Sequence, residues 1–233
     1  MRKEVVVTAD KVRRRNKFNR IVKLSLLLLL LFLIVIYIIL QVIYDNGRFT
    51  VSLDSNKTLE SGIAIYESLD DPQGKRRLSA TELDFMDNIS IKWLPEDLTE
   101  HEGSHNGDNY IAYSFYIENQ GEEILNYWYE FEMRDVIKNV DEAIRIMVIR
   151  NEETKIYAKV NPLDGQPEDG TVPFKEDEII ILEQRQNFQP KDIDKFTIVI
   201  WLEGDDPECV DSLIGGELKL QMNIREEHIQ PKK

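Results

Sequence analysis

The hydrophobic residues of the chain follow one pattern before residue 47 and another after it. Residues 24–43 read LSLLLLLLFLIVIYIILQVI, a run of 20 residues without a charged side chain. A helix rises 1.5 Å per residue, so this run spans about 30 Å, the thickness of the hydrocarbon core of a bilayer. The run has no polar face, which argues against a core helix of a soluble domain. It predicts one transmembrane helix at residues 21–44.

Farther along the chain, apolar and polar residues alternate with a period of two. Because successive side chains of a strand point to opposite faces, this alternation predicts half-buried strands. The alternating runs are residues 49–54, 89–94, 111–117, 125–134 and 218–225. Three further runs are apolar on both sides, which is typical of central strands in a packed sandwich. These runs are residues 144–149, 178–182 and 196–202.

Helical signals after residue 47 are few and short. Ser79 with Glu82, and Asn139 with Glu142, have the spacing of a capping box and predict two short helices. About nine strands with little helix indicate an all-β fold, in which two antiparallel sheets form a sandwich of the jelly-roll or immunoglobulin-like type. We expect residues 45–233 to form this domain after the transmembrane helix.

The distribution of charge predicts the orientation of the chain in the membrane. Residues 1–23 contain nine Lys/Arg and two Asp/Glu. Of the 29 Lys/Arg and 43 Asp/Glu in the whole chain, 20 and 41 therefore remain for residues 24–233, a balance of −21. Basic flanks stay in the cytoplasm. We expect a basic cytoplasmic tail at residues 1–20, a membrane anchor that contacts lipid at residues 21–44, and an extracellular domain at residues 45–233.

A cleaved signal peptide is the alternative reading of the apolar run. Signal peptides have shorter apolar regions, of roughly 7–15 residues, and end in small residues around the cleavage site. Here the run is longer and its end, Gln41-Val42-Ile43-Tyr44-Asp45, offers no such site. The sequence therefore favours an uncleaved signal anchor and a single-pass protein of the cell membrane.

Charge and cysteine content exclude some classes of function. The acidic domain argues against a nucleic acid partner, because phosphate neutralisation requires a basic surface. Cys209 is the single cysteine, so the chain has no internal disulfide and no pair of thiols for redox chemistry or a zinc ribbon. Its carboxylate neighbours disfavour the thiolate, and we expect Cys209 to be a small packed or weakly exposed residue rather than a nucleophile.

His101-Glu102-Gly103-Ser104-His105 matches the HExxH pattern of zinc proteases. That motif depends on a helix, which places both histidines on one face beside the glutamate. Here Gly-Ser interrupts the motif and turn residues follow it. We expect a solvated loop before a strand, and the zinc site remains the alternative.

Two acidic loops and an aromatic run are the other candidate sites. Calcium is bound by six to eight oxygens from loops of this kind, although neither loop has EF-hand spacing. The aromatic run, Tyr127-Trp128-Tyr129, places Trp128 on the less apolar face of its strand, where it could stack on a sugar or a partner. The acidic residues are Asp164, Glu168 and Asp169 in one loop, and Glu203, Asp205, Asp206, Glu208 and Asp211 in the other.

Three stretches of the sequence are considered together: residues 103–121, residues 141–148, and residues 201–209 (WLEGDDPEC) with Gly215-Gly216. They resemble exported surface proteins of Gram-positive bacteria, namely the TasA/camelysin group of biofilm-fibre and surface proteins. The resemblance implies a jelly-roll sandwich with a cell-surface or matrix role. This chain differs in retaining an anchor, and no motif is present onto which catalytic residues could be carried.

We therefore expect a membrane-anchored surface protein with a structural, adhesion or matrix-assembly role, without enzymatic activity, catalytic residues, metal or cofactor. The expected partners are an envelope or matrix protein, or a second copy of the chain bound through an edge strand. Two alternatives remain: a metal-dependent surface peptidase of the camelysin type, and an accessory subunit of a membrane complex.

Overall fold

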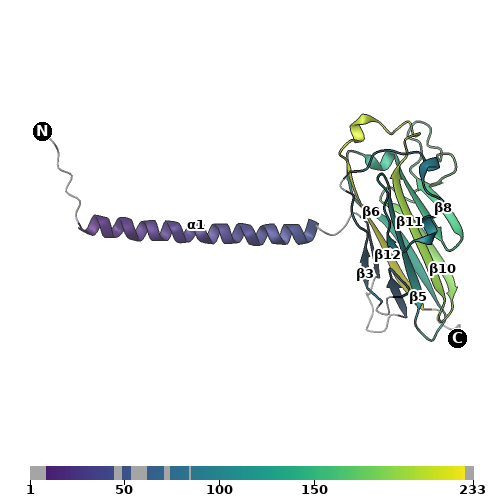
Figure 1. Cartoon of the computed structure of the whole chain (residues 1–233), viewed down its shortest axis with the longest axis horizontal. Helices are drawn as coiled ribbons and strands as arrows, with labels where there is room; N and C mark the ends of the chain where they lie inside the picture. Colours follow the sequence, from purple (N-terminus) through teal and green to yellow (C-terminus); the bar gives the residue numbers. More distant parts are fainter. Residues whose placement is uncertain (1–8, 45–48, 54–61, 71–73, 84, 229–233) are drawn as a thin grey trace. The chain divides into compact units, whose positions relative to one another are not determined.

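The computed structural model describes residues 9–44, 49–53, 62–70, 74–83 and 85–228, and it divides the chain into two units, 1–46 and 47–233. The first unit contains one continuous helix, α1 (Ala9–Tyr44), drawn in purple in Figure 1. Within it, the span Arg14–Ile38 contains an 18-residue window that has a mean hydropathy of 3.0 and no buried residue, so the helix is apolar enough to cross a membrane. The helix begins well before residue 21, and residues 1–8 of the expected cytoplasmic tail lie outside the described residues.

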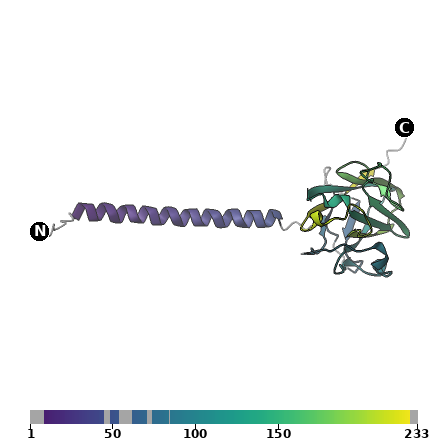
Figure 2. The ribbon, with the colours of Figure 1, turned by 90° about the horizontal axis from the view of Figure 1, so that it is seen from above.

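The second unit consists mainly of strands in two sheets, which Figure 2 shows in a view along the strands. Sheet A has the order β10-β6-β12-β1-β3, and sheet B has the order β2-β5-β11-β7-β8-β9 with β4 beside β5. The strands are β1 (Phe49–Leu53), β2 (Ile63–Tyr66), β3 (Arg77–Ser79), β4 (Gly103–Ser104), β5 (Ile111–Asn119), β6 (Leu125–Ile137), β7 (Ile144–Arg150), β8 (Glu153–Ala158), β9 (Val172–Pro173), β10 (Ile179–Phe188), β11 (Ile193–Leu202) and β12 (Glu217–His228). Four short 3₁₀ turns accompany them: η1 (Ile91–Trp93), η2 (Leu98–Glu100), η3 (Val140–Glu142) and η4 (Asp211–Leu213).

One apolar core lies between the two sheets and includes residues from both. Tyr129 of β6 packs edge-on against Phe196 of β11, with ring centroids 5.3 Å apart. Phe49 of β1 packs in the same way against Tyr113 of β5, at 6.0 Å. These contacts join opposite sheets, so the domain has the general architecture of a β-sandwich, as the alternation predicts.

The sheets are mixed, which corrects the expectation of antiparallel sheets. β1 pairs in parallel with β12, with Phe49 opposite Leu220, and β8 pairs in parallel with β9. The remaining strand pairs are antiparallel. Because β1 and β12 are far apart in the sequence, no short turn restricts their relative direction.

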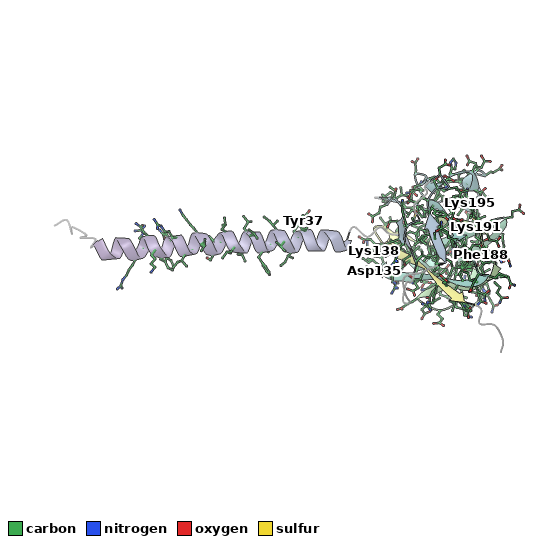
Figure 3. All side chains as sticks on the ribbon, turned by 90° about the horizontal axis from the view of Figure 1, so that it is seen from below. Tyr37, Asp135, Lys138, Phe188, Lys191 and Lys195 are labelled. Carbon is green, nitrogen blue, oxygen red and sulfur yellow. The ribbon has the colours of Figure 1, made fainter. Side chains whose placement is uncertain are left out.

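The ends of the strands define two ends of the domain. Phe188 pairs with Leu125 at the start of β6, so the β10–β11 turn that contains Lys191 lies at that end. Asp135 and Lys138 lie at the other end of β6, and Figure 3 shows these two residues well apart from Phe188 and Lys191.

Three local predictions were wrong or only partly right. Residues 89–94 do not form a strand: Ile89 makes a single bridge to Glu203, η1 follows, and Trp93 is 73% exposed. No helix begins at Ser79, which ends β3. At Asn139 only the single turn η3 forms, and the Asn139 side chain makes no capping hydrogen bond.

The three doubly apolar runs are strands, but they are not all central. The runs at residues 144–149 and 196–202 lie in β7 and β11, which each have a neighbour on both sides. β10, which contains most of the run at residues 178–182, is an edge strand, and its Leu182 is 41% exposed.

Candidate functional site

The outer face of sheet A carries a polar groove of about 420 Å³. Its walls come from three neighbouring strands, β1, β12 and β6. We call this feature the sheet A groove, and its lining residues are Ser52, Leu53, Glu130, Glu132, Arg134, Gln221, Asn223 and Arg225.

Strand register explains why these side chains meet. Asn223 of β12 lies opposite Ser52 of β1 on one side and Glu130 of β6 on the other, and Gln221 lies opposite Glu132. The alternate residues of β6 and β12, such as Phe131 and Met222, point inward and are buried. The period-two pattern therefore places the polar positions of both strands on one surface.

The floor of the groove is a network of side-chain hydrogen bonds. Ser52 Oγ donates to Asn223 Oδ1 at 2.9 Å. The Gln221 amide donates to Asn223 Oδ1 at 2.7 Å and to Ser52 Oγ at 3.1 Å. Arg134 Nε donates to Gln221 Oε1 at 3.1 Å, which joins the floor to the wall formed by β6. These bonds hold the amide and hydroxyl groups in fixed orientations.

Two carboxylates and two guanidinium groups line the groove. Arg134 pairs with Glu132 at 2.6 Å, and Arg225 approaches Glu130 at 3.9 Å. Partial burial and the neighbouring Glu132 carboxylate raise the pKa of Glu130 above its ordinary value. The groove therefore offers both acceptors and donors, with balanced formal charge.

Trp128 lies beside the groove on the same face of β6, as the sequence predicts. It pairs with Arg225 of β12 and with Gln184 of β10. Its indole Nε1 donates to Glu227 Oε2 at 3.0 Å, which fixes the ring, and the side chain is only half-buried. Trp128 is not itself a lining residue, and it adjoins the groove through its cross-strand neighbour Arg225.

The HExxH residues do not form the zinc-protease arrangement. Gly103 and Ser104 form the short strand β4 rather than a helix. The rings of His101 and His105 lie 5.2 Å apart, but Glu102 is turned away and accepts a hydrogen bond from the Tyr116 hydroxyl at 2.7 Å. Glu102 is therefore not free to act as the base beside the two histidines.

His105 is the half-buried histidine of this pair. Its environment predicts that the free energy of unfolding depends on pH. Burial lowers the pKa of His105 below its ordinary value of 6.5, and its Nε2 atom is buried without a hydrogen-bond partner. The unfolded chain therefore binds more protons than the folded chain just below pH 6.5. We expect the free energy of unfolding to decrease as the pH falls from 7.5 to 5.5, by less than about 1.4 kcal/mol per pH unit, the limit for one proton.

Urea denaturation of the full chain in micelles at several pH values measures this effect. His105→Gln is expected to remove most of the pH dependence, while His101→Gln, at an exposed position, is the matched control. An unchanged slope in His105→Gln would contradict the assignment.

The two acidic loops lie close together in the structure, although they are separate calcium candidates in the sequence. Carboxylate oxygens of Glu168, Asp206 and Glu208 all lie within 4.8 Å of one another. Arg145 of β7 lies among them, paired with the Asp206 carboxylate and 3.9 Å from that of Glu168. Arg145 is 5% exposed and supplies the positive charge that a calcium ion would otherwise bring. No local sequence pattern indicates this arginine, because it lies within an apolar strand.

The remaining acidic residues lie outside that group. Glu203 accepts a hydrogen bond from the buried Trp201 Nε1 at 3.0 Å, and Asp205 accepts one from Ser90. The group of three is the one such cluster found among the described residues, and it does not include Asp164, Asp169 or Asp211.

Cys209 lines an apolar pocket of about 210 Å³ at the start of β12. The pocket is formed largely by Val140, Ile144, Leu202 and Leu213. Burial raises the pKa of the Cys209 thiol, which disfavours the reactive thiolate at neutral pH. Cys209 is partly buried, which agrees with the prediction of a packed or weakly exposed residue.

Comparisons with known proteins identify no relative. No family model matches the chain, and no curated protein matches it. Two structures of beta-glucosidase from Kluyveromyces marxianus align with 9% and 10% identity and TM-scores of 0.24 and 0.25. They cover 78% and 77% of this chain but only 17% and 19% of their own, so the chain spans less than a fifth of their length.

A third solved structure, of AvmM, which catalyses macrocyclization in alchivemycin A biosynthesis, aligns over 54% of this chain and 83% of its own, with 14% identity and a TM-score of 0.20. None of these similarities is close enough to support a shared fold or activity.

Proposed function

We propose that the chain is a single-pass membrane protein that presents its strand domain outside the cell for binding and adhesion. The observation that carries this proposal is the unequal distribution of charged residues before and after the apolar part of α1. Nine basic residues lie among residues 1–23, and a domain with an excess of 21 acidic residues follows the apolar helix. Basic flanks tend to stay in the cytoplasm, which supports an external location for the domain.

The sheet A groove supports a binding role rather than catalysis. It is preorganised by hydrogen bonds and has balanced charge, while the HExxH segment lacks the helix that a zinc peptidase needs. We place the protein among jelly-roll surface or matrix proteins of the envelope, with an envelope component or a second copy as its partner. Among the described residues β10 is an edge strand of sheet A, and it is our candidate for pairing with a like domain.

Cysteine labelling on intact cells tests this topology. In a Cys209→Ser background, Leu163→Cys introduces a thiol at a position that is 88% exposed in the domain. Arg14→Cys introduces one on the basic side of the apolar segment. A membrane-impermeant maleimide is expected to label the first variant on intact cells and the second only after permeabilisation. The reverse pattern would refute the proposed orientation.

A further inference from the structure

We propose that the sheet A groove binds a neutral polysaccharide, with Trp128 stacking on the face of a sugar ring. This inference rests on the proposed function, because it names the ligand class for the same surface. The groove, at about 420 Å³, falls in the range of roughly 300–1,000 Å³ that is usual for ligand sites.

The polar side chains of the groove match the chemistry of sugar hydroxyl groups. Each hydroxyl both donates and accepts a hydrogen bond, so a site for it needs neighbouring donors and acceptors. Glu130 and Glu132 supply acceptors, while the half-exposed guanidinium groups of Arg134 and Arg225 supply donors. Asn223 and Gln221 lie between them on β12 and are already oriented by Ser52. Little ordering is therefore needed when a ligand binds.

Trp128 supplies the apolar part of the recognition. The ring of a pyranose presents C–H groups on its faces, and these pack on an aromatic surface. The indole is held by its hydrogen bond to Glu227 and lies next to Arg225 across the β6–β12 pair. A sugar chain that packs on the indole would therefore reach the groove past Arg225, which lines it.

Charge distinguishes a neutral polymer from an anionic one. Two carboxylates balance two guanidinium groups within the groove, so it has no excess charge for an ionic ligand. The domain around it is acidic, since residues 24–233 carry 21 more acidic than basic side chains. An anionic polymer would meet repulsion from this field, whereas a neutral polymer would not.

Co-sedimentation tests the inference with the full chain in lipid nanodiscs and three insoluble neutral polymers: chitin, cellulose and mannan. We expect retention on at least one of them and none on an anionic polygalacturonate gel. Trp128→Ala and Gln221→Ala are each expected to weaken binding at least tenfold, and Trp128→Phe less than Trp128→Ala. Leu163→Ala, which is exposed and outside the groove, is the matched control and should bind as the parent chain does.

Far-UV circular dichroism confirms that each variant is folded before it is tested. Absence of binding to all three neutral polymers would overturn the inference, as would binding that Trp128→Ala and Gln221→Ala leave unchanged, or retention on polygalacturonate alone. Maleimide labelling distinguishes a failure of this ligand assignment from a failure of the proposed orientation. A domain that is labelled outside the cell but binds no polymer refutes only the ligand, and a domain that binds the polymer but is labelled only after permeabilisation refutes only the orientation.

Discussion

Replacing Leu28 and Leu31 with arginine is expected to move the protein from the membrane fraction to the soluble fraction. Both residues lie within the apolar part of α1, where they are 61% and 57% exposed. On insertion scales, an arginine at the centre of a transmembrane helix costs about 2.5–3.5 kcal/mol, so two cost about 5–7 kcal/mol. No residue of the apolar window is buried, so packing within the helical unit does not offset the cost.

Ultracentrifugation of cell lysates, followed by immunoblotting of pellet and supernatant, measures the distribution. Leu28→Ile with Leu31→Ile is the matched control, because it keeps the two positions apolar, and it should remain in the pellet. Mass spectrometry of the parent protein tests whether the mature chain retains the apolar segment. A mature chain that begins after residue 44 would show that the segment is a cleaved signal rather than an anchor.

Replacing Arg145 with methionine is expected to destabilise the domain by about 3–5 kcal/mol, because it leaves a buried charge without its partner. The side chain of Arg145 is 6% exposed, and that of Asp206, its partner, is fully buried. Burial alone would raise the pKa of Asp206, but hydrogen bonds from Glu208 and the Arg145 guanidinium outweigh burial and lower it. The neighbouring Asp206 carboxylate raises the pKa of Glu208.

Guanidinium chloride denaturation at pH 7 measures the loss. The double variant Arg145→Met with Asp206→Leu removes both charges, and it is expected to recover a large part of the stability. Lys75→Met is the control for a surface pair: Lys75 and Glu67 lie 2.8 Å apart with side chains 44% and 34% exposed, and such pairs contribute about 0–1 kcal/mol. Equal losses in Arg145→Met and Lys75→Met would show that Arg145 does not hold the two loops together.

The sequence predicted strands well where alternation was long. Residues 125–134 lie in β6 and residues 218–225 lie in β12. Their polar positions are on the outer face of sheet A. Short patterns were less informative. Three alternating apolar residues at 89–93 gave η1 instead of a strand, because Ile89 finds only one bridging partner. The Ser79–Glu82 spacing was not followed by apolar helical periodicity, and Ser79 pairs with Thr50 of β1 instead.

The sequence predicts which side chains of the candidate site share a face of one strand, but it does not predict which strands lie side by side. Alternation placed Trp128 and Glu130 on one face of β6, but no local pattern indicated that β12 lies beside β6 and β1 beside β12. Similarly, each acidic loop was visible in the sequence, while their meeting around Arg145 depends on long-range packing. Local residue patterns determine which face a side chain occupies, and tertiary contacts determine its neighbours.

The parallel pairing of β1 with β12 also determines when the domain can be completed. Ser52 and Asn223, which bond to each other across this pair, are 171 residues apart. At typical rates of synthesis of 5–20 residues per second, the ribosome needs roughly 10–30 s to make the chain between them. Until then β1 lacks its parallel neighbour, and its unpaired edge is open to other chains. The interval between the first and last strands is therefore the period in which a nascent molecule is most vulnerable to aggregation.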